Sequence, residues 1–176
     1  MEQPVTIAAG LVLVDALAAA VCDVRTRRIP NALVGALLLA GIVANAFGGW
    51  KPVAVDVLLV AAVVIAGTFA FSLKLIGGGD VKLLAAAAGT LGYPACVFFI
   101  LCTLVSGGLI AVAYAAMRGR LRATFANVQT MAIPVFAGVR PARPDGTPMP
   151  YALAIFAGAL CTALVNSFAP HLRLLP

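Results

Sequence analysis

Two aspartates, Asp23 and Asp80, are the residues of this chain whose type and setting could support chemistry. Asp23 ends the first long apolar run, and Asp80 follows three glycines, Gly77 to Gly79. Two carboxylates that meet at one site share a proton near neutral pH, because both cannot ionise easily. The ionised one can deprotonate a water, and the protonated one can hydrogen-bond to a carbonyl and later protonate a leaving nitrogen. The pair predicts peptide hydrolysis without a metal or a covalent intermediate.

Both aspartates also have simpler interpretations. An aspartate that starts a helix is a good N-cap and interacts favourably with the positive helix end, which suits Asp80. Asp23 could be a loop residue just past the end of a helix, or an ion-pair partner of Arg25 or Arg27. From the placement of charge alone, these alternatives stay open.

The other four acidic residues differ in setting. Glu2 and Asp145 are expected to be solvated. Asp15 lies in the middle of the first apolar run, where a carboxylate costs about 2.5–3.5 kcal/mol on insertion into a bilayer. We favour pairing of Asp15 with another helix over a water path toward Asp23. Asp56, in the first turns of the third run, has no predicted role.

The elements that must position these residues are membrane helices. Hydrophobic residues make up 63% of the chain and charged residues 10%, with a mean hydropathy of +1.09. These values exclude a soluble domain and a disordered chain. The long apolar runs lack the alternation of a membrane β-barrel. The sequence therefore predicts an all-α, polytopic membrane protein with about six transmembrane helices and short loops.

The apolar runs divide the chain into six expected spans within one transmembrane domain, residues 1–176. The fourth, at about 18 Å, is too short for a bilayer core of about 30 Å, so its start is expected to be recessed in the protein. A segment that is polar at both ends, residues 118–149, is expected to be a cytoplasmic or interfacial loop. The expected spans cover residues 4–22, 30–47, 53–75, 80–91, 95–117 and 150–169.

The basic residues orient the spans. The chain has 12 Lys+Arg against 6 Asp+Glu, and most arginines lie in two loops, after the first and the fifth spans. The positive-inside rule makes both loops cytoplasmic and accounts for the net charge of +6 without nucleic acid. Asp23 and Asp80 then lie at the same, cytoplasmic depth. No cofactor or metal is expected, because the four cysteines (Cys22, Cys96, Cys102 and Cys161) form no CxxC pair.

Three segments carry a resemblance to a known family. Asp23-Val-Arg-Thr-Arg-Arg-Ile-Pro-Asn31 and Gly77-Gly-Gly-Asp-Val-Lys-Leu-Leu84 resemble the two aspartate motifs of the bacterial type IV prepilin peptidases, which are intramembrane aspartic peptidases with a glycine-any-glycine-aspartate signature. Met149-Pro-Tyr-Ala-Leu-Ala-Ile-Phe-Ala-Gly-Ala159 resembles the segment that opens their last helix. The resemblance covers nearly the whole chain in order and spacing.

The resemblance implies an endopeptidase of the bacterial inner membrane that removes the short basic leader of prepilins at the cytoplasmic face. Asp23 and Asp80 match the two catalytic aspartates. Gly77, Gly78 and Gly79 are expected to face the substrate. Arg27 and Arg28 are candidate contacts that could select or exclude a basic leader, although we favour the positive-inside rule as the explanation of their charge.

The size of the chain resembles the compact branch of that family, which is associated with Flp-type, tight-adherence pili. Larger relatives carry a four-cysteine zinc segment that is linked to N-methylation of the pilin, and this sequence has no such cluster. Peptidase activity without methylation is therefore expected, with the prepilin, the bilayer and the pilus assembly machinery as candidate partners. The alternatives are a small proton-coupled transporter, with the aspartates as relay groups, and a non-catalytic assembly subunit.

Overall fold

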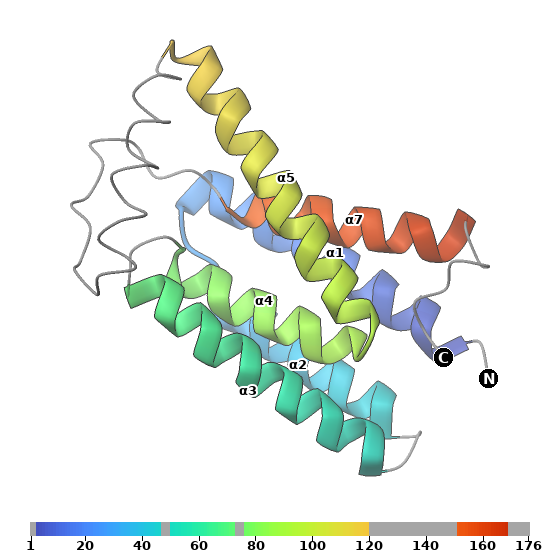
Figure 1. Cartoon of the computed structure of the whole chain (residues 1–176). Coiled ribbons are helices and arrows are strands. Elements are labelled where there is room, and N and C mark those ends of the chain that lie inside the picture. Colours follow the sequence, from blue (N-terminus) through green and yellow to red (C-terminus); the bar gives the residue numbers. More distant parts are fainter. Residues whose placement is uncertain (1–2, 47–49, 73–75, 120–150, 169–176) are drawn as a thin grey trace.

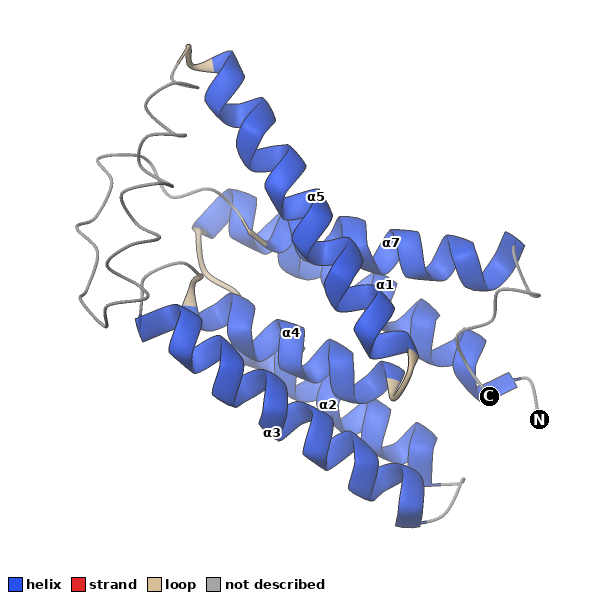
Figure 2. Cartoon of the chain, viewed as in Figure 1, coloured by secondary structure: helices blue, strands red, loops and turns tan. Residues whose placement is uncertain are grey.

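Helices make up almost the whole of the described structure. The computed structural model describes residues 3–46, 50–72, 76–119 and 151–168, and no strand occurs among them (Figure 2). This confirms the all-α prediction. The helices are α1 (Gln3–Thr26), α2 (Asn31–Ala46), α3 (Trp50–Ser72), α4 (Gly78–Leu91), α5 (Ala95–Met117) and α7 (Ala152–Phe168).

Three of these helices are long and apolar enough to cross a membrane. They contain the stretches Ile7–Thr26, Val53–Ser72 and Ala95–Met117, whereas α2 and α7 are shorter apolar helices. Large aliphatic side chains are exposed along α1, α3 and α5, as expected of helices that face lipid. The chain is therefore an all-α membrane protein. Most of the predicted loop, residues 120–150, lies outside the described residues.

The short helix α4 forms the centre of the bundle. Nine of its fourteen residues are buried, including the consecutive alanines Ala85 to Ala88. Small side chains let helix backbones approach closely. Membrane helices depend on such close packing, because lipid tails are as apolar as the helices and the hydrophobic effect does not drive the helices together. Figure 1 shows α4 alongside α3, with α2 behind it and α5 crossing at an angle. α4 is therefore held from several sides.

The start of α4 lies level with the end of α3 and with the turn between α1 and α2. A methyl group on Gly78 would lie 3.5 Å from the ring of Phe71, in the last turn of α3. A methyl group on Gly79 would lie 3.4 Å from Ile29, in the turn after α1. We call this end of the bundle, where α1 ends and α4 begins, the site end, and the opposite end the far end.

The missing length of α4 lies at the far end. There Gly92, which follows α4, lies beside Asp56 in the second turn of α3, so α3 extends beyond it. The first residues of α4, Gly78 to Asp80, are half-buried at the site end. The helix stops early because Gly92, with φ +68, leads into the turn to α5.

At the site end, α5 extends beyond its neighbours. Gly107 of α5 packs against Tyr151, the residue that precedes α7. α5 continues for ten more residues to Met117, which is about 15 Å at 1.5 Å per residue. In Figure 1 this part of α5 projects past the starts of α4 and α7.

Candidate active site

Asp23 lies within the last turn of α1, not after the helix as predicted. α1 continues to Thr26 and ends at Arg27, which has φ +53. The Arg27 N–H donates to the Asp23 carbonyl over 2.8 Å. A left-handed residue that closes such a bond is a common helix C-cap, usually glycine. The helix therefore fixes the backbone of Asp23, and its side chain is half-buried.

The turn after Asp23 is held by a threonine. Thr26 Oγ1 lies 2.9 Å from the carbonyl of Cys22 and 3.2 Å from that of Arg28. Arg27 and Arg28, the predicted leader contacts, are exposed at the site end. Their position suits both interpretations of their charge, contact with a leader and retention on the cytoplasmic side.

Asp80 is the third residue of α4, and the N-cap is Gly77. The interpretation of Asp80 as an N-cap is therefore wrong. The Gly77 N–H lies near the Asp80 carboxylate and favours its charged form, as the return half of a capping box does. Asp80 Oδ1 is buried and has no hydrogen-bond partner among the described residues. A buried polar atom left without a partner is costly, and such atoms occur where a ligand or reaction needs them.

The glycines before Asp80 leave space for its carboxylate. A methyl group on Gly77 would lie only 2.7 Å from Asp80 Oδ2, whereas one on Gly78 would make an ordinary contact with Phe71. The backbone of Gly77 is extended, with φ −75 and ψ 148, so an alanine there would not strain the chain. Gly77 is required for room beside the carboxylate and not for backbone freedom.

Two contacts bring the aspartate segments together. Gly79 packs against Ile29, and Lys82 Nζ lies 3.4 Å from Asn31 Oδ1 at the start of α2. The negative charge of Asp23 acts on Asp80, so the two carboxylates lie within electrostatic range. The structure thus places the two aspartates that the sequence singled out at the same end of the bundle.

The remaining acidic residues of the helices take different positions. Asp15 Oδ2, in the middle of α1, is buried and has no partner among the described residues, so the favoured pairing with another helix is not seen there. Asp56 is 7% exposed and accepts a hydrogen bond of 2.7 Å from Asn45 Nδ2. Sequence reasoning did not identify Asn45, although an amide near the end of an apolar run was a usable signal.

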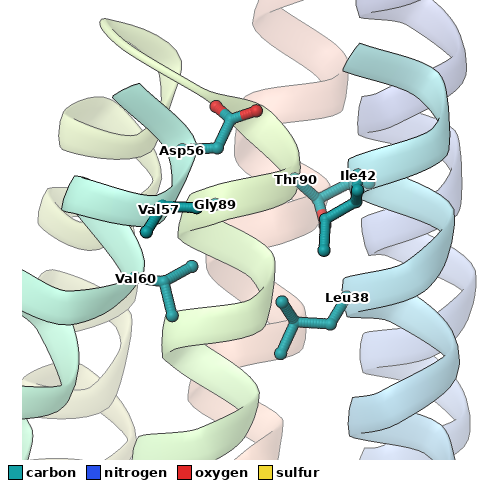
Figure 3. Close-up of a pocket in the computed structure, with 8 residues that line it drawn as sticks. Leu38, Ile42, Asp56, Val57, Val60, Gly89 and Thr90 are labelled. Carbon is teal, nitrogen blue, oxygen red and sulfur yellow. The ribbon is translucent and has the colours of Figure 1, made fainter. Parts of the chain in front are cut away.

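The cavity shown in Figure 3 lies away from Asp23 and Asp80. Its volume is about 90 Å³. Apolar side chains of α2 and α3, together with Gly89 and Thr90 of α4, line most of it, and Asp56 stands at one end (Figure 3). It belongs to the far half of the bundle and contains no second group for acid–base chemistry. The chemistry is therefore expected at the site end.

The groups at the site end suit acid–base catalysis. No group of three His, Cys, Asp or Glu residues able to hold a metal ion occurs in the part of the chain that the structure describes. Two carboxylates, one of them with an unpaired oxygen, can hold one proton and exchange it with a water and an amide. Hydrolysis of an amide bond is the reaction that this arrangement fits.

Comparison with known proteins identifies one family. The sequence profile of the type IV leader peptidase family matches residues 10–112, more than half of the chain. This region includes both aspartate segments. No curated protein and no solved structure shows significant similarity to the chain.

Proposed function

Because the chain belongs to the type IV leader peptidase family, we propose that it is an intramembrane aspartic endopeptidase whose catalytic residues are Asp23 and Asp80. The observation that carries the proposal is the convergence of these two carboxylates at one end of the bundle. The unpaired Oδ1 of Asp80 supports it, because the packing leaves this oxygen available to a water or a substrate.

The proposed reaction starts with one proton shared by the two aspartates. The ionised carboxylate takes a proton from a water, whose oxygen attacks the carbonyl carbon of the scissile peptide bond. The protonated carboxyl hydrogen-bonds to the carbonyl oxygen and stabilises the tetrahedral intermediate. The C–N bond then breaks as the nitrogen receives a proton, which gives a carboxylate on the leader and a free amine on the mature chain. The pair ends with one proton and is ready for another cycle.

The proposed substrates are type IV prepilins of the Flp type, whose short basic leader precedes an apolar helix. The exposed Arg27 and Arg28 lie beside Asp23 and are candidate contacts of the leader, and Gly77 to Gly79 would let an extended backbone approach Asp80. The proposed location is the bacterial inner membrane, crossed several times, with the aspartates at the cytoplasmic face. The arginines beside Asp23 support this orientation.

We further propose that the enzyme does not methylate its product. The four cysteines stand in α1, α5 and α7 and cannot form a compact cluster in one loop. Mass spectrometry of the new amino terminus tests this point separately from cleavage. An unmodified terminus is expected, and a mass increase of one methyl group would contradict it.

The main test is cleavage of a co-expressed, tagged prepilin. Asp23→Asn and Asp80→Asn should each leave the full-length precursor, while both variants accumulate in the membrane at the wild-type level. Asp145→Asn, a carboxylate predicted to be solvated, is the matched control and should cleave normally. Normal processing by either of the first two variants would refute the assignment.

The same variants test the alternatives. A proton-coupled transporter would show ion-dependent uptake in liposomes that is lost in the aspartate variants, without any cleavage by the wild type. A non-catalytic assembly subunit would support pilus formation with both substitutions in place. Either result would replace the peptidase proposal.

A further inference from the structure

Tyr151 is a polar side chain at the site end for which neither the sequence motifs nor the proposed reaction provides a role. It stands immediately before α7, and its carbonyl accepts the N–H groups of Ala154 over 2.9 Å and Ile155 over 3.3 Å. These bonds fix its backbone to the first turn of α7. Its ring is half-buried and packs against the core that α1, α4, α5 and α7 share.

A glycine of α5 fixes the position of the side chain. A methyl group on Gly107 would lie 3.3 Å from Tyr151 Oη and 3.4 Å from its Cε2. The adjacent Ser106 Oγ donates to the Ala154 carbonyl over 3.0 Å, which ties α5 to α7 at this level. The phenol therefore lies against the bare backbone of Gly107, in a position that the packing determines.

The hydroxyl of Tyr151 lies at the same end of the bundle as Asp80. Helix α7 packs against α1 and α4, and the charge of Asp80 acts on the Tyr151 phenol. No hydrogen bond to this hydroxyl occurs among the described residues. A phenol has an ordinary pKa of about 10 and keeps its proton at neutral pH. The site end thus holds an O–H donor that is fixed by packing, has no hydrogen-bond partner among the described residues, and lies within electrostatic range of Asp80.

The chemistry at the site requires such a donor. When water attacks a peptide carbonyl, negative charge develops on the carbonyl oxygen, and fixed donors aimed at that oxygen lower the barrier. Of the two aspartates, only the protonated one can donate, and it must later give up its proton. A donor that never changes its protonation state would hold the oxygen throughout the reaction.

We propose that Tyr151 is a third catalytic residue, whose hydroxyl donates a hydrogen bond to the scissile carbonyl oxygen and to the oxyanion that forms from it. This inference rests on the proposed peptidase function. The hydroxyl keeps its proton at every step, so the proton balance of the two aspartates is unchanged. Gly107 acts through Tyr151 by allowing the phenol to lie close to α5.

The test compares purified Tyr151→Phe with the wild type on a prepilin peptide, because this substitution removes one oxygen and keeps the ring. Loss of one oxyanion donor should lower kcat by about 10²-fold, with KM changed by less than about threefold. Tyr93→Phe, an exposed tyrosine in the turn after α4, is the matched control and should be unchanged. Gly107→Ala, which crowds the phenol, should lower kcat by about tenfold.

The pH profile separates a direct role from an indirect one. If Tyr151 contacts the substrate, Tyr151→Phe should lower kcat by the same factor at every pH. The pH values at which kcat rises and falls should stay those of the wild type. If Tyr151 only adjusts the ionisation of the aspartates, these pH values would shift, and the proposal would be overturned. A wild-type kcat in Tyr151→Phe would also overturn it. Asp80→Asn, assayed in parallel, keeps the two proposals apart: cleavage by that variant would refute the peptidase function itself.

Discussion

The carboxylates of Asp56 and Asp80, at opposite ends of the bundle, differ in the partners that surround them. At the far end, Asp56 is almost fully buried, and Asn45 donates a hydrogen bond of 2.7 Å to it. At the site end, Asp80 is only partly enclosed, yet its Oδ1 is buried without a partner among the described residues. Both aspartates stand within the first two turns of their helices. Position in the helix therefore does not distinguish them, but the partners that the fold supplies do.

The difference shows two outcomes of burying a carboxylate, which costs free energy. A buried carboxylate with a fixed amide donor is compensated and joins α2 to α3, which makes Asp56 part of the scaffold. A buried carboxylate oxygen without a donor costs stability, and this cost is typical of a functional site. We therefore expect substitutions at the two aspartates to have opposite effects on activity and stability.

The largest expected effect is on activity at Asp80. Asp80→Asn should reduce prepilin cleavage by about 10³-fold or more, because an amide can neither take nor supply the required proton. The same variant should unfold in detergent at the wild-type temperature or higher, because it removes a buried charge. Loss of cleavage together with a clear fall in Tm would place Asp80 in the scaffold and remove the contrast with Asp56.

The next effect separates neighbouring glycines. Gly77→Ala should lower kcat by about 30-fold, because its methyl group would displace the Asp80 carboxylate, and each tenfold loss corresponds to about 1.4 kcal/mol. Gly78→Ala, whose methyl group meets only the Phe71 ring at 3.5 Å, is the matched control and should lower it by less than about threefold. Equal losses in the two variants would indicate a general requirement for glycine in this segment.

At the far end the effect should fall on stability. Asn45→Ala leaves the Asp56 carboxylate buried without its donor and should destabilise the protein by about 1–3 kcal/mol. Cleavage per folded molecule should stay within about twofold of the wild type. Unfolding in a mixed detergent series measures the loss of stability. A cleavage assay normalised to the amount of folded protein measures the activity per folded molecule. A catalytic loss without destabilisation would contradict a scaffold role for Asn45 and Asp56.

The smallest expected effect concerns the turn after Asp23. Arg27 holds a left-handed conformation that costs a non-glycine residue about 1–2 kcal/mol, so Arg27→Gly should raise stability by up to about 1 kcal/mol after the added freedom of the unfolded chain is counted. Arg28→Gly, whose φ is not positive, is the control for loss of charge and should not stabilise. If the leader contacts Arg27, KM for a basic leader should change as well, and a peptide with a neutral leader would reveal it.

The sequence was sufficient to predict the class of the fold and the position of Asp23 and Asp80 at one end of the bundle, because both depend on local signals. Apolar runs of helical length and the glycine breaks between them predict the helices. The arginines beside Asp23 orient the helices and so indicate that Asp23 and Asp80 lie at the same end of the bundle. The last turn of α1 was missed, because Asp23 and the arginines after it are polar and the helix continues through them to Thr26.

The partners of the carboxylates could not be predicted, because they depend on packing between helices. Asn45 reaches Asp56 only because α2 and α3 form a hairpin with a particular rotation. Tyr151 lies far from Asp80 in the sequence, and the packing of α7 against α1 and α5 brings it to the site end. The absence of a donor for Asp80 Oδ1 is likewise a property of the assembled structure.

The overhang of α5 would set how far a substrate must reach to meet the proposed catalytic pair. The ten residues of α5 after Gly107 extend up to about 15 Å beyond the starts of α4 and α7. A chain that enters from the headgroup region must cover that depth in extended form, which takes four or five residues at about 3.3 Å each. The overhang would thus select those precursors whose cleavage point lies a fixed number of residues from the membrane surface.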